Sequence, residues 1–165
     1  MDNSIIRVLG IDPGYDRLGF ACVKGVATDL RSAELVDVGI ISSTKQNSFN
    51  ARFLEINNDL KTLFTKLKPD VVVIEKVVAT SRSQVLLRIA EVIGAVKAVA
   101  VDTSSEILEV YPSTLKRFIT GDGRASKSKI RKYIHAQFSL DITGVVDDSL
   151  DALAVALYGL INTKL

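Results

Sequence analysis

Apolar residues follow two different spacings along the chain. Short β-branched runs at residues 5–12 (IIRVLGID), 18–25 (LGFACVKG) and 33–42 (AELVDVGIIS) are separated by turn-forming residues, which is typical of neighbouring strands in an antiparallel meander. Over residues 49–67, apolar side chains recur at intervals of three and four, as on one face of an amphipathic helix. The first part of the chain therefore predicts three strands followed by a helix.

The second part alternates short apolar runs with helical patterns. Residues 70–76 (DVVVIEK) are typical of a parallel strand covered on both faces, and residues 107–112 (ILEVYP) predict a further strand. Helical patterns follow at residues 81–101, 112–121, 127–138 and 147–161. Pro112 suits a helix start, Gly121 a helix end and Ser126 an N-cap. The element order predicts an α/β fold whose mixed central sheet has three neighbouring strands and then two parallel strands, flanked by helices.

Composition supports an ordinary folded chain. With 165 residues, of which 47% are apolar and 24% charged, we expect a single domain over residues 1–165 with a full core. One cysteine permits no internal disulfide and favours a reducing compartment, so we expect a cytoplasmic protein. No apolar run is long enough to span a membrane, and no signal peptide is visible.

Acidic residues stand at three points where the predicted elements could meet. Asp12 ends the first strand, Glu75 closes the fourth, and Asp148 and Asp151 share one face of the last helix. Residues at the carboxyl ends of adjacent parallel strands point into one crevice, so all four carboxylates converge if that helix face meets it. For each acid alone, solvation or helix capping is the commoner explanation, and Asp147 is an alternative cap.

Converging carboxylates repel one another, and a divalent cation removes the conflict. Their hard oxygen atoms suit Mg²⁺, for which Mn²⁺ can substitute. Two such ions about 3.5–4 Å apart are the arrangement used for phosphodiester hydrolysis. The acids therefore predict an active site with two Mg²⁺ ions that hydrolyses phosphodiesters.

Four motifs resemble those of a known family. LGIDPG, VVIEKV, YPSTLKRFITGDGRASKSKI and DDSLDALAVAL occur in this order over residues 7–160 and resemble the RuvC family of Holliday-junction resolvases. The resemblance implies a ribonuclease H-like fold, a homodimer and Mg²⁺-dependent nicking of Holliday junctions, and we expect forks and flaps as further substrates, in recombination and repair. It implies that Lys116 and Lys127 are catalytic, near the scissile phosphate. It also assigns metal binding and catalysis to Asp12, Glu75, Asp148 and Asp151.

Basic residues gather in one segment of the chain. A solvated surface would account for them on charge alone, but within the resemblance they are expected to contact DNA phosphates without reading sequence. The predicted DNA-binding residues of this segment are Lys116, Arg117, Arg124, Lys127, Lys129, Arg131 and Lys132. Arg82 and Arg88, which follow Glu75, are expected to line the same groove.

The chain departs from the family pattern at Val78. Family members commonly have a phenylalanine there, three residues after the glutamate, where it is thought to wedge into the junction. Valine has no aromatic face on which a base can stack. We therefore expect a looser, structure-selective nuclease. The broad apolar arc of the helix at residues 81–101 is the candidate interface of the dimer.

Two other functions fit part of the pattern. A branched-DNA-binding protein without catalysis would keep the basic segment, although the presence of all four acids argues against it. An ATP-binding domain of the actin and Hsp70 class opens with a similar Asp-Gly turn. That class needs a two-lobed architecture for which 165 residues are too few.

Overall fold

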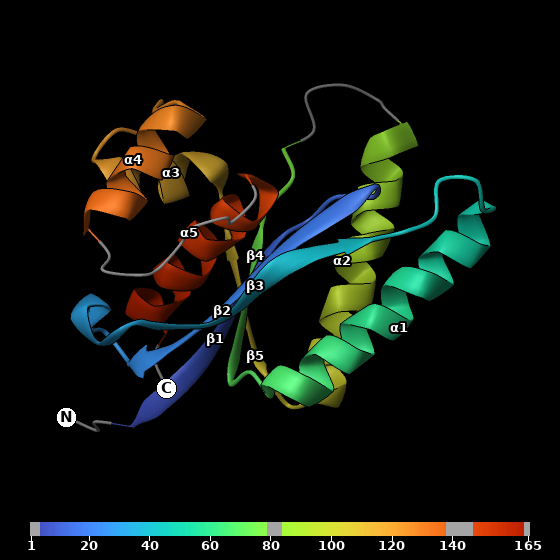
Figure 1. Cartoon of the computed structure of the whole chain (residues 1–165), viewed down its shortest axis with the longest axis horizontal. Coiled ribbons are helices and arrows are strands. Elements are labelled where there is room, and N and C mark those ends of the chain that lie inside the picture. Colours follow the sequence, from blue (N-terminus) through green and yellow to red (C-terminus); the bar gives the residue numbers. More distant parts are fainter. Residues whose placement is uncertain (1–3, 79–83, 138–146, 164–165) are drawn as a thin grey trace.

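A five-stranded mixed sheet forms the centre of the computed structural model, which describes residues 4–78, 84–137 and 147–163 (Figure 1). The strands are β1 (Ile5–Asp12), β2 (Arg17–Val26), β3 (Glu34–Ser42), β4 (Val71–Glu75) and β5 (Glu106–Val110), in the spatial order β3-β2-β1-β4-β5. β1, β2 and β3 pair antiparallel, whereas β4 pairs parallel to both β1 and β5. The predicted mixed sheet is confirmed.

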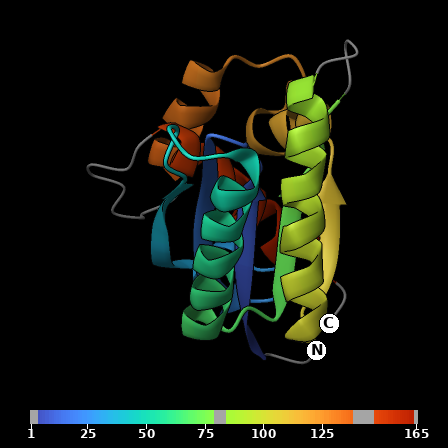
Figure 2. The same cartoon turned by 90° about the vertical axis from the view of Figure 1, so that its right-hand side faces the viewer.

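Helices cover both faces of this sheet. They are α1 (Phe49–Leu67), α2 (Gln84–Asp102), α3 (Pro112–Thr120), α4 (Lys127–Gln137) and α5 (Asp147–Asn162), and a short 3-10 turn, η1 (Leu30–Ser32), joins β2 to β3. α1 and α2 lie side by side over one face, and α3, α4 and α5 lie on the other (Figures 1 and 2). None of the helices in the described ranges is long and apolar enough to cross a membrane.

Alternate side chains of β1 and β4 supply the two halves of the core. Leu9 and Ile74 pack in the cluster beneath α1 and α2, whereas Val8 and Val73 pack in the cluster with α5. Successive side chains of a strand point to opposite faces, so a strand covered on both sides is apolar throughout. The only cysteine, Cys22, is fully buried in the sheet opposite Leu9, and burial raises the pKa of its thiol to about 12.

The helix boundaries follow the predicted local signals. Pro112 opens α3, and Gly121 ends it with a φ of 75°. The Ser126 hydroxyl accepts a hydrogen bond from the Lys129 backbone N–H at 3.3 Å, as expected of an N-cap. The predicted strand at 107–112 begins one residue earlier and ends at Val110, because the proline belongs to the next helix. Residues 81–83 of the predicted second helix lie outside the described residues.

The backbones of β1 and α5 meet at Gly10. A Cβ atom there would lie 2.2 Å from the Ala152 carbonyl oxygen and 2.4 Å from the Ala156 amide nitrogen. Real Cβ atoms do not approach other atoms so closely, so only glycine fits. Asp12 lies two residues after Gly10, and Asp151 directly precedes Ala152. This close approach therefore determines how near the acidic end of β1 comes to the start of α5.

Replacing Gly10 with alanine should force β1 and α5 apart and lower the free energy of unfolding by about 3 kcal/mol. Asn58, at an exposed position of α1, is the control. Asn58→Ala should raise stability by up to about 1 kcal/mol, because alanine is the better helix former. Urea unfolding of both variants measures the difference, and equal effects would contradict the close approach.

Candidate active site

Three acids from three different elements line one small cavity. Asp12, Glu75 and Asp151 lie around a space of about 70 Å³, together with Lys116 and Lys127. The apolar side chains of Leu115, Ile130 and Ala154 complete the lining. The structure thus brings together three of the four predicted acids and both predicted lysines. The side chain of Asp148, in the first turn of α5, lies outside the described part of the chain.

Sheet topology explains the position of the first two acids. In the parallel β1–β4 pair, Ile11 lies opposite Ile74, and Asp12 and Glu75 are the next residues of their strands. The carboxyl ends of these strands therefore share one edge of the sheet, where sites of α/β proteins commonly form. α5 crosses β1 on the same side and brings Asp151 to this edge.

Burial and mutual repulsion act on Glu75. Its partial burial, and secondarily the charges of Asp12 and Asp151, raise the pKa of this carboxyl to about 7, whereas Lys127 and Lys116 oppose the shift. Three carboxylates face only two ammonium groups, so the described part of the cavity has an excess of negative charge when all are ionised. A strongly shifted carboxyl in a charged cavity is a recognised mark of a functional site.

Lys127 already pairs with one of the acids. Its ammonium group donates a hydrogen bond to the Asp151 carboxylate at 2.5 Å. The lysine side chain is 75% exposed, whereas that of Asp151 is 18% exposed. The pair therefore joins a partly buried carboxylate to a cation that reaches it from the solvent, across the gap between α4 and α5.

The chemistry of these donors fits a hard divalent cation. Carboxylate oxygens are the ligands that Mg²⁺ prefers, and a cation among these acids would offset the repulsion that raises the Glu75 pKa. Within the described ranges, which leave out the Asp148 side chain, no three His, Cys, Asp or Glu side chains are grouped closely enough to hold an ion together. Asp12, Glu75 and Asp151 share a cavity, but these three acids by themselves are not grouped as the ligands of one ion.

Most of the predicted DNA-binding residues that the structure describes lie in or next to α3 and α4. Arg117 and Arg124 line an open cavity of about 520 Å³ at the end of α3. In α4, Lys129 pairs with Asp122 at 3.5 Å, Lys132 is exposed, and Arg131 lines a narrow space beside Lys127. These residues form, with Lys116 and Lys127, a basic surface around α3 and α4, next to the acidic cavity.

Arg88 lies apart from that basic surface. It stands on α2, on the other face of the sheet, with its guanidinium group 5.1 Å from the centre of the Tyr15 ring. Arg82 lies outside the described residues. In the described residues, the basic surface beside the acidic cavity is therefore formed around α3 and α4.

The turn that follows Asp12 is held by a buried arginine that the sequence pattern did not single out. Arg52 of α1 is 7% exposed and donates hydrogen bonds to Asp16 at 2.6 Å and to Ser43 at 2.8 Å. Its guanidinium group also lies 4.1 Å from the centre of the Tyr15 ring, and its hydrogen bond lowers the Asp16 pKa. The signal was available, because Arg52 lies four residues before Ile56 on the buried face of α1.

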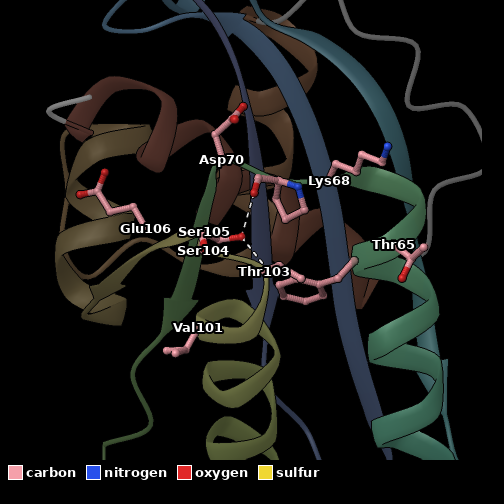
Figure 3. A pocket seen from close by; sticks show the side chains of 10 residues that line it. Thr65, Lys68, Asp70, Val101, Thr103, Ser104, Ser105 and Glu106 are labelled. Atoms are coloured by element: carbon pink, nitrogen blue, oxygen red, sulfur yellow. Dashed lines mark hydrogen bonds between the residues drawn. The ribbon is translucent and has the colours of Figure 1, made fainter.

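A wider cavity, of about 840 Å³, lies at the opposite end of the sheet, between the C-terminal ends of α1 and α2 (Figure 3). Two of its hydroxyl groups already donate to backbone carbonyl groups. Ser105 donates to the Pro69 carbonyl oxygen at 2.8 Å, and Thr103 donates to that of Val99 at 2.9 Å. The larger volume of this cavity is therefore not by itself a sign of a functional site, and the acids line the much smaller one.

The fold is an α/β domain of the ribonuclease H-like class. This class is defined here by the sheet order, the helices on both faces and the acids at the strand ends. The family model described as "Crossover junction endodeoxyribonuclease RuvC" matches residues 8–158. The chain therefore belongs to the RuvC family of crossover junction endodeoxyribonucleases.

Curated relatives support the same assignment. The RuvC endonuclease of Prochlorococcus marinus subsp. pastoris is 33% identical over 152 residues, covering 92% of this chain and 94% of the relative. That of Gloeobacter violaceus is 35% identical over 156 residues, covering 93% and 87%. The chain thus spans most of the length of both relatives.

Solved structures confirm the fold. Thermus thermophilus RuvC in complex with a Holliday junction substrate matches with a TM-score of 0.82 and 24% identity, covering 92% of this chain and 91% of that one. A second structure of Thermus thermophilus RuvC matches with a TM-score of 0.83 and 22% identity, covering 94% of each chain. The predicted ribonuclease H-like architecture is confirmed over nearly the whole chain.

In metal-free protein, Glu75→Gln should stabilise the fold only where Glu75 of the wild type is ionised. The folded-state pKa of about 7 lies above the ordinary value of 4.5, so ionisation opposes folding. This cost is absent below about pH 4.5 and complete above about pH 7. The variant's advantage in free energy of unfolding should therefore grow to about 2 kcal/mol at pH 8.

Urea unfolding in EDTA at pH 4.5, 6 and 8 measures this advantage. Asp59→Asn, at an exposed position of α1, is the control for the loss of a surface carboxylate. A constant difference between the Glu75→Gln variant and the wild type would mean that Glu75 is not destabilised by its surroundings.

Proposed function

We propose that this protein is a Mg²⁺-dependent endonuclease that nicks Holliday junctions, and also forks and flaps, during recombination and repair. The observation that carries the proposal is the cavity in which Asp12, Glu75 and Asp151 meet Lys116 and Lys127, in a chain of the crossover junction endodeoxyribonuclease family. The Thermus relative in complex with a Holliday junction supports the choice of substrate.

The acids are proposed to bind two Mg²⁺ ions, and Mn²⁺ in their place. When bound, the ions would activate the attacking water and stabilise the leaving 3′ oxygen. Asp12 and Glu75, at adjacent strand ends, supply donors from a rigid part of the sheet. Asp151, and Asp148 three residues before it, supply donors from α5. Deprotonation of Glu75 is required for this role, so activity should fall as the pH is lowered.

Lys116 and Lys127 are proposed to hold the scissile phosphate. Both line the acidic cavity, one from α3 and one from α4. A lysine there acts as a point cation that offsets the charge of the phosphate as the transition state forms. Around them, the remaining basic residues would contact backbone phosphates, giving salt-dependent affinity that is largely independent of sequence. These residues are Arg117, Arg124, Lys129, Arg131 and Lys132. Arg88, on the other face of the sheet, and Arg82, which lies outside the described residues, are proposed as further phosphate contacts.

Asp12→Asn should lose at least about 100-fold in nicking rate while retaining its affinity for junction DNA, because the amide is a poor metal ligand but leaves the basic surface intact. The assay compares a four-way junction, a fork, a flap and a linear duplex in Mg²⁺, with EDTA and Ca²⁺ as controls. Asp59→Asn, at an exposed acid of α1, should behave like the wild type.

The outcomes of this assay separate the possible functions. A wild-type protein that binds branched DNA but nicks none would be a binding protein without catalysis. Unchanged nicking by the Asp12→Asn variant would remove this acid from the mechanism. Nicking of the four-way junction alone would contradict the looser selectivity expected from Val78.

The outer side of α2 is proposed to form the homodimer interface. Leu87 is 68% exposed and Val101 67% exposed, and Gly94 lies between them with nothing within 4 Å of its Cβ position. Residues seven apart share one side of a helix, so these three form an apolar strip on which a second copy can pack closely. A twofold dimer would supply two active sites for paired nicks in opposing strands.

Leu87→Glu should raise the dissociation constant of the dimer at least about tenfold, because the strip would then bury an unpaired charge. Leu54→Glu is the matched control, since Leu54 is 59% exposed on α1. Sedimentation of both variants over a range of micromolar concentrations measures the effect. A Leu87→Glu variant that sediments like the wild type would exclude this side of α2.

A further inference from the structure

We propose that Tyr111 and the apolar cavity beside it receive one unstacked nucleobase at the branch point of the DNA substrate. The inference rests on the proposed function. It assigns the binding of a base to residues outside the acidic cavity, and it names the aromatic side chain that stacks on the base.

Tyr111 is an aromatic residue in an unusual setting. It is 54% exposed, and no other aromatic residue in the described ranges is classed as exposed. Its side chain makes no capping hydrogen bond to α3, although it directly precedes that helix. Neither the core nor the helix start therefore explains why a large aromatic ring stands at this surface position.

A cavity of about 460 Å³ adjoins the ring. Val77, Val78, Leu86 and Ile93 supply apolar lining, from the segment after β4 and from α2. Val77 and Val78 are themselves exposed, at 38% and 56%. A cavity of this size and polarity is within the range that accepts one planar, mostly apolar group.

Positive charge borders the cavity. The Lys76 ammonium group lies 4.6 Å from the centre of the Tyr111 ring, over one of its faces. Lys76 and Lys97 share a single carboxylate, Glu109, at 3.9 Å and 2.8 Å. Two cations against one anion leave a net positive charge, which suits the phosphate that every nucleotide carries.

Backbone pairing between β4 and β5 places this cavity close to the acidic site. Lys76 directly follows Glu75, and its N–H donates to the Val110 carbonyl oxygen at 2.8 Å, immediately before Tyr111. Glu75 in turn pairs with Val110 between β4 and β5. A nucleotide held against Tyr111 would therefore lie close to the strand end that carries Glu75.

A base fits this cavity better than a second copy of the chain. Every base has an aromatic face, so stacking on tyrosine tolerates any sequence. A second copy would bring the same excess of lysine charge to the contact, and the two would repel, whereas DNA brings phosphates. Base pairs beside a branch open more readily than pairs inside a continuous duplex, so the preference should be for branched over linear DNA.

The test measures binding with Ca²⁺ in place of Mg²⁺, on a four-way junction and on a linear duplex of equal length. Tyr111→Ala should weaken binding to the junction about tenfold and leave the duplex unchanged. Tyr111→Phe should retain junction affinity, because phenylalanine still stacks. Leu54→Ala, which removes an apolar side chain of similar exposure from α1, is the control for nonspecific loss.

A scan of the DNA identifies the base. Each nucleotide flanking the branch, together with its counterpart under the twofold symmetry of the proposed dimer, is replaced by an abasic one, and the wild type is compared with Tyr111→Ala. At one position the loss from Tyr111→Ala should disappear, because the base that stacked on the ring is already missing.

The outcomes distinguish the inference from its alternatives. Equal losses on junction and duplex, additive losses at every abasic position, or no loss at all would overturn the base site. A change in oligomeric state of the Tyr111→Ala variant without DNA would mean that a second copy covers the ring. If the wild type binds the junction no better than the duplex, the proposed function itself fails.

Discussion

The close approach of β1 and α5 at Gly10 is the constraint on which the site depends. A strand and a helix normally stand apart by the thickness of their side chains, but here a Cβ would collide with the backbone at Ala152 and Ala156. This removes a layer of side chains from between Asp12 and Asp151, which come from opposite ends of the sequence. Sheet pairing then adds Glu75 from β4, so that packing brings the acidic charges together against their mutual repulsion.

That repulsion connects stability to function. Packing energy holds carboxylates in a position that solvent would not favour, and the raised pKa of Glu75 measures part of the cost. Lys127 offsets part of it at Asp151. In the proposed function, a bound cation would offset this repulsion, and sites of converging charge with a shifted pKa are common where proteins carry out chemistry.

The sequence predicted most of the fold because its local signals agree with one another. The apolar run ending at Glu75 gave a parallel strand, and Pro112 and Gly121 gave the limits of α3. It also indicated Asp12, Glu75 and Asp151, because strand ends and a helix face can be read from periodicity. Arg52 was missed, since its burial depends on a tertiary partner, Asp16, that lies far away in the chain. Tyr111 was missed because exposure of an aromatic ring has no local signal.

The single thiol of this protein can report how often strand β2 separates from the rest of the sheet. Cys22 of β2 is fully buried opposite Leu9 of β1, and Leu9 lies three residues before Asp12. A thiol with a pKa of about 12 reacts only after it reaches solvent. Alkylation of the native protein would therefore report how readily β2 separates from its neighbours. Slower alkylation in the presence of Mg²⁺ or DNA would reveal how strongly either ligand rigidifies the strand that carries Asp12.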